Sequence, residues 1–161
     1  MLHLYLLRHG KAANPASYDV DYDRPLNKKG IAQINQIGFR LKQDNLIPHQ
    51  IISSSAKRTE ETTATVNHYL EIGDITFLKE LYLAKDEVIL HHLVKNAEKK
   101  EILYVGHNFG ISNIASYFSG ETISMSTGML VHFTFEVDKW EHVGKDSGIV
   151  KDIYIPDVFI P

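Results

Sequence analysis

The sequence predicts an α/β fold of three layers, α/β/α, with a mostly parallel central sheet. Two observations lead to this prediction. Short apolar runs typical of buried strands alternate with longer segments whose apolar residues recur at helical spacing. A β-α-β-α order is typical of parallel sheets, because each connecting helix packs back on the sheet. With 161 residues, 43% of them hydrophobic, the chain has the size of one domain, and we expect residues 1–161 to form a single domain.

The first half of the chain contains three predicted strands and two predicted helices. The strands are expected at residues 2–7, 50–53 and 76–78. Ile34, Ile37 and Leu41 recur at helical spacing, and Asn27 just upstream is a candidate N-cap. A second helix is expected over residues 56–70, although its apolar stripe is weak. The order of these segments fits two β-α-β units.

The second half continues the alternation and then changes to two strands. Ile89, Leu93 and Ala97 indicate a helical face, residues 101–105 a buried strand, and residues 111–118 the helix behind it. Residues 129–137 alternate strictly between apolar and other side chains, which predicts a strand buried on one face. We expect the segment "GIVKDIYI" to pair with that strand.

Composition excludes several classes of function. The net charge of −3 and the scattered lysines leave no basic surface for nucleic acid. The absence of cysteine excludes disulfides, thiolate metal sites and thiol nucleophiles. The N-terminal apolar run is too short for a signal peptide or a membrane span, so we expect no membrane association and a cytoplasmic location.

Unusual polar residues follow three of the predicted strands. Arg8 and His9 come directly after the first strand, and Ser54 and Arg58 follow the second. His107 follows the strand at 101–105. Ligands of open α/β sheets bind beyond the carboxyl ends of the strands, where helix N-termini also attract anions. Because only four of the 17 Lys and Arg residues are arginines, two of them at this edge predict a phosphate pocket around two histidines.

These motifs resemble those of the histidine phosphatase superfamily, and in particular its short bacterial branch of SixA-like phosphohistidine phosphatases. The resemblance covers nearly the whole chain and implies a phosphoglycerate mutase-like fold. Asn27, Ser55 and Thr59 depart from the usual Thr, Pro and Ala of these motifs, at positions that we expect to serve packing. The segments with the resemblance are "LLRHGKA", "DYDRPLNKKG", "SSSAKRTEET" and "YVGHN".

The resemblance implies a metal-independent reaction without a cofactor. His9 is then the nucleophile and forms a transient phosphohistidine, while Arg8, Arg58 and His107 hold the phosphoryl oxygens. Ser54 is a further candidate ligand of the phosphate. Glu80 aligns loosely with a glutamate that protonates the leaving group in larger members of the superfamily, and a solvated glutamate is an equal alternative.

The substrate stays open at the level of the sequence. The chain has no long insertion that could form a lid, so an open pocket favours phosphohistidine on a protein partner. The alternatives are a phosphatase of small phosphomonoesters, a mutase, which must shield a bisphosphate intermediate from water, and a non-catalytic phosphate-binding module. The partner is accordingly a phosphorylated protein or a small phosphorylated molecule.

Other polar residues receive plainer interpretations. Asp19, Asp21 and Asp23 imitate the start of a calcium loop but lack its glycine and its final glutamate, so a solvated loop near the pocket mouth is expected. Asn14 and Tyr82 could line the pocket. No pair of histidines has the spacing of a zinc-binding helix. We expect structural or surface roles for His3, His49, His68, His91, His92, His132 and His142.

Overall fold

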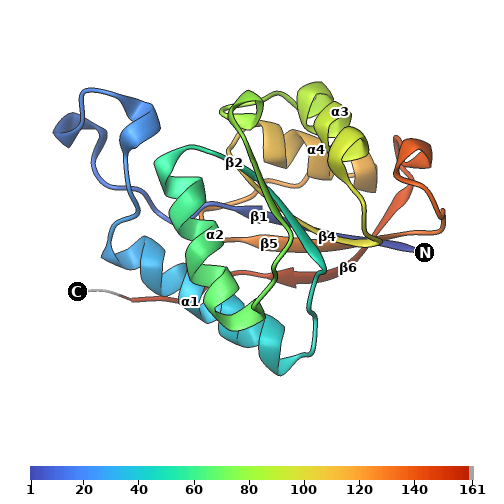
Figure 1. Ribbon diagram of the computed structural model, residues 1–161, viewed down its shortest axis with the longest axis horizontal. Helices are drawn as coiled ribbons and strands as arrows, with labels where there is room; N and C mark the ends of the chain where they lie inside the picture. The colour runs from blue at the N-terminus through green and yellow to red at the C-terminus, as the bar shows by residue number, and fades with distance from the viewer. Residues whose placement is uncertain (160–161) are drawn as a thin grey trace.

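A single six-stranded sheet, in the order β3-β2-β4-β1-β5-β6, forms the centre of the computed structural model, which describes residues 1–159 (Figure 1). The strands are β1 (Leu2–Arg8), β2 (Gln50–Ser54), β3 (Ile75–Leu78), β4 (Glu101–Gly106), β5 (Leu130–Phe135) and β6 (Gly148–Tyr154). Strands β3, β2, β4 and β1 pair in parallel, whereas β5 is antiparallel to both of its neighbours. The predicted mostly parallel sheet, with its last two strands paired, is confirmed.

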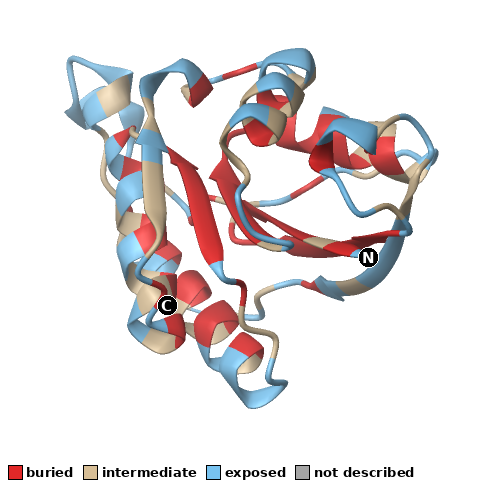
Figure 2. Ribbon diagram, turned by 45° about the vertical axis from the view of Figure 1, so that its right-hand side comes forward, coloured by how far each residue is buried: buried red, intermediate tan, exposed pale blue. Residues whose placement is uncertain are grey.

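Helices cover both faces of this sheet and complete the predicted three layers (Figures 1 and 2). Helices α1 (Lys28–Gln43) and α2 (Lys57–Leu70) pack on one face, and α3 (Asp86–Asn96) and α4 (Gly110–Ser119) on the other. Short 3-10 helices lie in the connections: η1 (Pro15–Ser17), η2 (Asp21–Asp23), η3 (Lys79–Leu81) and η4 (Trp140–His142). Successive residues of β1 enter opposite cores, because side chains alternate across a strand.

Two local details explain how the helices begin and pack. Asn27 caps α1, as expected, since its side-chain oxygen accepts a hydrogen bond from Gly30 N at 2.8 Å. The weak apolar stripe of α2 has a structural reason: its buried face includes Thr59, Thr62 and Thr63, and their hydroxyls are hydrogen-bonded. A helix can bury these threonines because each of the three hydroxyls has a hydrogen-bond partner.

Strand β5 departs from the expectation of a half-buried strand. All six of its residues are buried, including His132 and Thr134 on the face that was expected to be exposed. His132 stacks on Tyr5 with ring centroids 4.1 Å apart. Its Nδ1 donates to the carboxylate of Asp152 at 2.8 Å, and its Nε2 lies 2.9 Å from Nδ1 of His3. The face is buried because β5 is an interior strand whose polar side chains find partners on β1 and β6.

The loop that leaves β1 packs directly on the first turn of α1. A Cβ atom at Gly30 would lie 2.1 Å from the carbonyl oxygen of Lys11, and one at Gly10 would lie 2.6 Å from the carbonyl oxygen of Gly30. This close approach requires glycine at both positions and fixes the backbone next to His9. Within residues 1–159, no helix combines the length and the hydropathy needed to cross a bilayer.

Candidate active site

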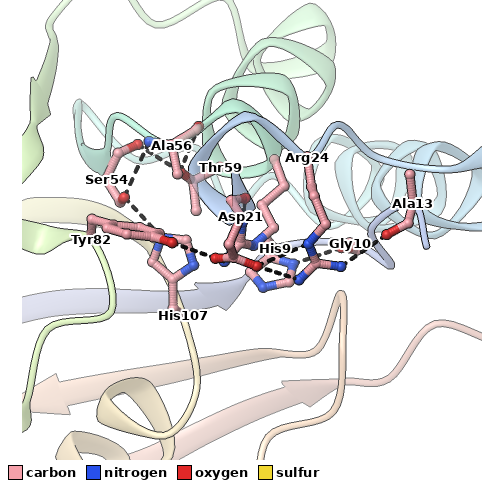
Figure 3. Close-up of polar contacts among 11 residues, drawn as sticks. His9, Gly10, Ala13, Asp21, Arg24, Ser54, Ala56, Thr59, Tyr82 and His107 are labelled. Atoms are coloured by element: carbon pink, nitrogen blue, oxygen red, sulfur yellow. Dashed lines mark hydrogen bonds and ion pairs between the residues drawn. The ribbon is translucent and has the colours of Figure 1, made fainter. Parts of the chain in front are cut away.

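The carboxyl ends of β1, β2 and β4 bring the predicted phosphate residues together. Arg8 and His9 follow β1, Arg58 lies in the first turn of α2 after β2, and His107 follows β4. The ring centroids of His9 and His107 are 5.3 Å apart, and Figure 3 shows the two side chains close together beneath the network of polar contacts around Asp21. The parallel pairing of β1 with β4 and of β4 with β2 is what places residues so distant in sequence at one edge.

His9 is held in the form that a nucleophile needs. Its Nδ1–H donates to the carbonyl oxygen of Gly10 at 2.7 Å, so the lone pair of the neutral ring lies on Nε2. Burial lowers the pKa of His9 to about 4, and the nearby charges of Arg58 and Arg8 contribute in the same direction. The ring is therefore neutral near pH 7, with Nε2 available to attack.

His107 is fixed from the other side of the pocket. Its Nε2 lies 2.8 Å from the hydroxyl oxygen of Ser54, which in turn accepts a bond from Ala56 N at 3.3 Å. Burial, followed by the proximity of His9, lowers the pKa of His107 to about 2. Ser54 is fully buried, and the structure places its hydroxyl against His107. When Ser54 donates to Nε2, the ring proton of His107 resides on Nδ1.

Three buried polar atoms in this cluster have no hydrogen-bond partner within the described part of the chain. They are Nε of Arg8, Nε of Arg58 and Nδ1 of His107. The terminal nitrogens of the two arginines are anchored instead: Arg8 Nη1 donates to Met125 O at 2.9 Å, and Arg58 donates to the backbone and side chain of Asp21. Buried polar atoms without partners are costly, so their presence together is unusual. The cluster combines two arginines and two histidines with polar nitrogens that lack partners, and this combination favours an anion.

Asp21 belongs to this site, which sequence reasoning missed. Its carboxylate accepts hydrogen bonds from Arg58 Nη2 at 3.0 Å, from Arg24 Nε at 2.9 Å and from the hydroxyl of Tyr82 (Figure 3). Arg24 Nη2 forms an ion pair with the same carboxylate at 2.9 Å. Partial burial raises the pKa of Asp21, but the bonds from Tyr82 and Arg58 outweigh it and hold the pKa at about 2. Asp21 is exposed, as expected for a solvated loop near the pocket mouth, but the sequence did not predict that η2 brings its carboxylate onto the arginines.

Tyr82 lies at the pocket, as the sequence allowed. Its ring packs edge-on against His107, with centroids 5.4 Å apart, and the guanidinium of Arg58 lies 5.8 Å from the ring centroid. No signal in the sequence demanded this position. Thr62, part of the third motif, accepts a hydrogen bond from Gly10 N at 3.1 Å and so ties α2 to the loop that carries His9.

The comparisons with known proteins agree with this geometry. Residues 4–87 match the profile of the histidine phosphatase superfamily (branch 1). The chain belongs to this superfamily. Over 157 residues it is 31% identical to an uncharacterized chloroplastic protein of Arabidopsis thaliana, covering 90% of this chain and 72% of that protein.

Solved structures give the same assignment of fold. A structure assigned as the phosphohistidine phosphatase SixA of Agrobacterium tumefaciens is 26% identical, with a TM-score of 0.84 and coverage of 96% of this chain and 98% of that chain. The protein histidine phosphatase SixA in complex with tungstate is similar in fold, with 17% identity, a TM-score of 0.79 and coverage of 94% and 96%. The phosphoglycerate mutase-like fold expected for a histidine phosphatase is confirmed.

Glu80, the candidate proton donor of this histidine phosphatase, is not part of the cluster. It is exposed on η3, and among residues 1–159 it makes no hydrogen bond or ion pair to a residue of the pocket. The described residues also contain no group of three His, Asp or Glu side chains arranged to hold a metal ion. The ionisable groups joined by the contacts described above are the two histidines, Arg8, Arg24, Arg58, Asp21 and Tyr82.

Proposed function

We propose that this protein is a phosphatase that removes phosphate from phosphohistidine on a protein substrate through a covalent phosphohistidine at His9. Phosphatase activity is supported by membership of the superfamily and by the SixA-like structures. The observation that carries the mechanism is the hydrogen bond from His9 Nδ1–H to Gly10 O, beside three buried nitrogens of Arg8, Arg58 and His107 without partners.

The reaction follows from the orientation of these groups. His9 Nε2 attacks phosphorus, the bond from phosphorus to the leaving group breaks, and the leaving group keeps the electron pair. Arg8, Arg58 and His107 hold the three outer oxygens while charge redistributes on them. Water then attacks the phosphorylated His9, the P–N bond breaks, and its electron pair returns to Nε2. Inorganic phosphate leaves and His9 is regenerated.

The protonation and position of the carboxyl groups of Asp21 and Glu80 favour a substrate with a P–N bond, such as phosphohistidine, over a phosphomonoester. An alkoxide leaving group needs a proton in the transition state, and positioned acids supply it with a gain of roughly 10²–10⁴-fold. Asp21 is ionised, with a pKa of about 2, and the Glu80 side chain is exposed without a hydrogen bond or ion pair to residues 1–159, so neither is held as an acid. The imidazole of phosphohistidine leaves as a neutral ring when its other nitrogen carries a proton, and it needs no such donor.

Two alternatives define the test. A phosphatase of small phosphomonoesters would use the same two arginines and two histidines as its phosphate cradle, and a phosphate-binding module would bind without turnover. We expect turnover of a phosphohistidine protein that exceeds turnover of common phosphomonoesters. Activity should survive exhaustive chelation, because the protein's own cations hold the phosphoryl group. The cytoplasmic location remains a prediction.

The deciding experiment follows phosphate on the protein itself. Rapid quench with labelled substrate should trap acid-labile, base-stable phosphate on the wild type and none on His9→Ala. His142→Ala, an exposed histidine on η4, is the matched control and should behave as the wild type. Near-normal turnover by His9→Ala would refute the assignment of the nucleophile. Binding of phosphate without turnover by the wild type would favour the phosphate-binding module.

A further inference from the structure

A cavity of about 440 Å³ extends from His9 to one side of the phosphate cradle. Arg8 and His9 line its inner end, whereas neither Arg58 nor His107 contributes to its wall. A phosphoryl group has roughly the bulk of three water molecules, each of which takes about 30 Å³ in the liquid. The cavity is therefore several times larger than the transferring group requires, and the excess space can hold another part of the substrate.

The outer wall of this cavity offers hydrogen-bond donors. Asn14 and Asn27 have their side-chain oxygens committed to Ala16 N and Gly30 N, at 2.9 and 2.8 Å. The amide Nδ2 of each side chain, a group that only donates, makes no hydrogen bond to a residue within 1–159. The hydroxyl oxygen of Thr127 likewise accepts from Gln33 Nε2 at 3.2 Å, which leaves its O–H to donate.

The charge of the wall is positive as well. Arg24 and Lys11 line it, and no carboxylate does. The Arg24 charge is compensated by Asp21, at 2.9 Å. Lys11 is different, because within residues 1–159 no carboxylate lies within ion-pairing distance of its ammonium group. Lys11 is exposed, and a space lined by neutral donors and basic residues favours an anion over a cation or an apolar group.

We propose that this cavity is a second anion subsite, which binds a carboxylate or a phosphate carried by the same substrate as the phosphoryl group. Lys11 is its specificity-determining residue, and Asn14, Asn27 and Thr127 supply the neutral donors. The inference rests on the proposed function, because it takes the cradle at His9 as the site of the transferring phosphoryl group. For a protein substrate, the anion is an acidic side chain next to the phosphohistidine.

The test compares three probes by isothermal titration: methylphosphonate, phosphonoacetate and methylenediphosphonate. The first carries only the group for the cradle, and the other two add a carboxylate or a second phosphonate. One charge-assisted contact implies a preference of about tenfold or more for at least one of the two-anion probes in the wild type. The probe with the larger gain identifies which anion the subsite takes.

Lys11→Gln is the deciding variant, and Lys42→Gln, an exposed lysine near the far end of α1, is its matched control. We expect Lys11→Gln to reduce the preference to about threefold or less and to leave the affinity for methylphosphonate within about twofold, since one charge-assisted contact is lost. Lys42→Gln should keep the wild-type preference. Equal affinities in the wild type, or an unchanged preference in Lys11→Gln, would overturn the subsite and leave the phosphatase proposal intact. If no probe binds, the cradle fails, and both proposals fall with it.

Discussion

His9 and His107 end two neighbouring strands, and one ring nitrogen of each is committed to a hydrogen bond. The partner of His9 is a carbonyl oxygen, which can only accept, so the proton on Nδ1 is assigned by chemistry. The partner of His107 is the hydroxyl of Ser54, which can donate or accept. A single serine thus decides whether His107 presents a donor to the phosphoryl oxygens, and we assign Ser54 to positioning.

Glu80→Gln separates the two interpretations of this glutamate. Because the side chain of Glu80 is exposed and no hydrogen bond or ion pair to residues 1–159 holds it, we expect small and equal effects on phosphomonoester and phosphohistidine hydrolysis. A general acid would behave differently, since its loss slows expulsion of an alkoxide by roughly 10²–10⁴-fold and spares imidazole. Steady-state kinetics with both substrates measure the difference. A selective loss on phosphomonoesters would place Glu80 in the reaction.

At the scale of elements, the contact between the β1 loop and α1 holds the nucleophile in place. We expect Gly30→Ala to lower stability by roughly 1–3 kcal/mol, as overpacking does, and to lower turnover as well. Its Cβ would meet the backbone of Lys11 at 2.1 Å, so the loop next to His9 must move.

Gly73→Ala is the control for this change. A Cβ atom there has no neighbour within 4 Å, so its stability and turnover should match the wild type. Urea denaturation and steady-state kinetics test both variants. Normal turnover in a destabilised Gly30→Ala would show that the loop tolerates the shift and that the contact serves stability alone.

Across the whole molecule, burial of histidines couples folding to pH. Burial lowers the pKa of His9 to about 4 and that of His107 to about 2, from the 6.5 of an exposed histidine. Below pH 6.5 the two histidines therefore bind protons in the unfolded chain but stay neutral in the folded chain, and the free energy of unfolding falls as pH decreases. Between pH 6.5 and its folded-state pKa, each histidine lowers the free energy of unfolding by on the order of 1 kcal/mol per pH unit. For His9 this range ends near pH 4.

Urea denaturation at pH 7 and pH 5 measures this coupling. We expect the wild type to lose stability between the two values, and His107→Gln to lose less, because glutamine does not titrate. His142→Gln, which replaces an exposed histidine, should keep the wild-type pH dependence. An identical slope in His107→Gln would contradict the assigned burial of a neutral His107.

The sequence alone predicted the layers, the strand pairing at the C-terminal end of the chain and the placement of Arg8, His9, Arg58 and His107 at one edge of the sheet. It could do so because apolar periodicity is local, and because cations and imidazoles at strand ends are unusual enough to be recognised. The prediction that β5 is buried on only one face was wrong for a related reason. Alternation identifies the apolar face, but it cannot show that the polar face of His132 and Thr134 is covered by interior neighbours.

Only the tertiary structure revealed the contacts of Asp21 and Tyr82 and the exposure of Glu80. Asp21 lies in a polar loop, and nothing in its local sequence shows that the loop folds back onto Arg58. The same holds for the cavity lined by Lys11, where Thr127 lines the same space as Asn14 and Asn27, which are 100 residues or more away in the sequence. Such contacts arise where separate loops converge above a sheet, and their geometry depends on packing between segments that carry no common pattern.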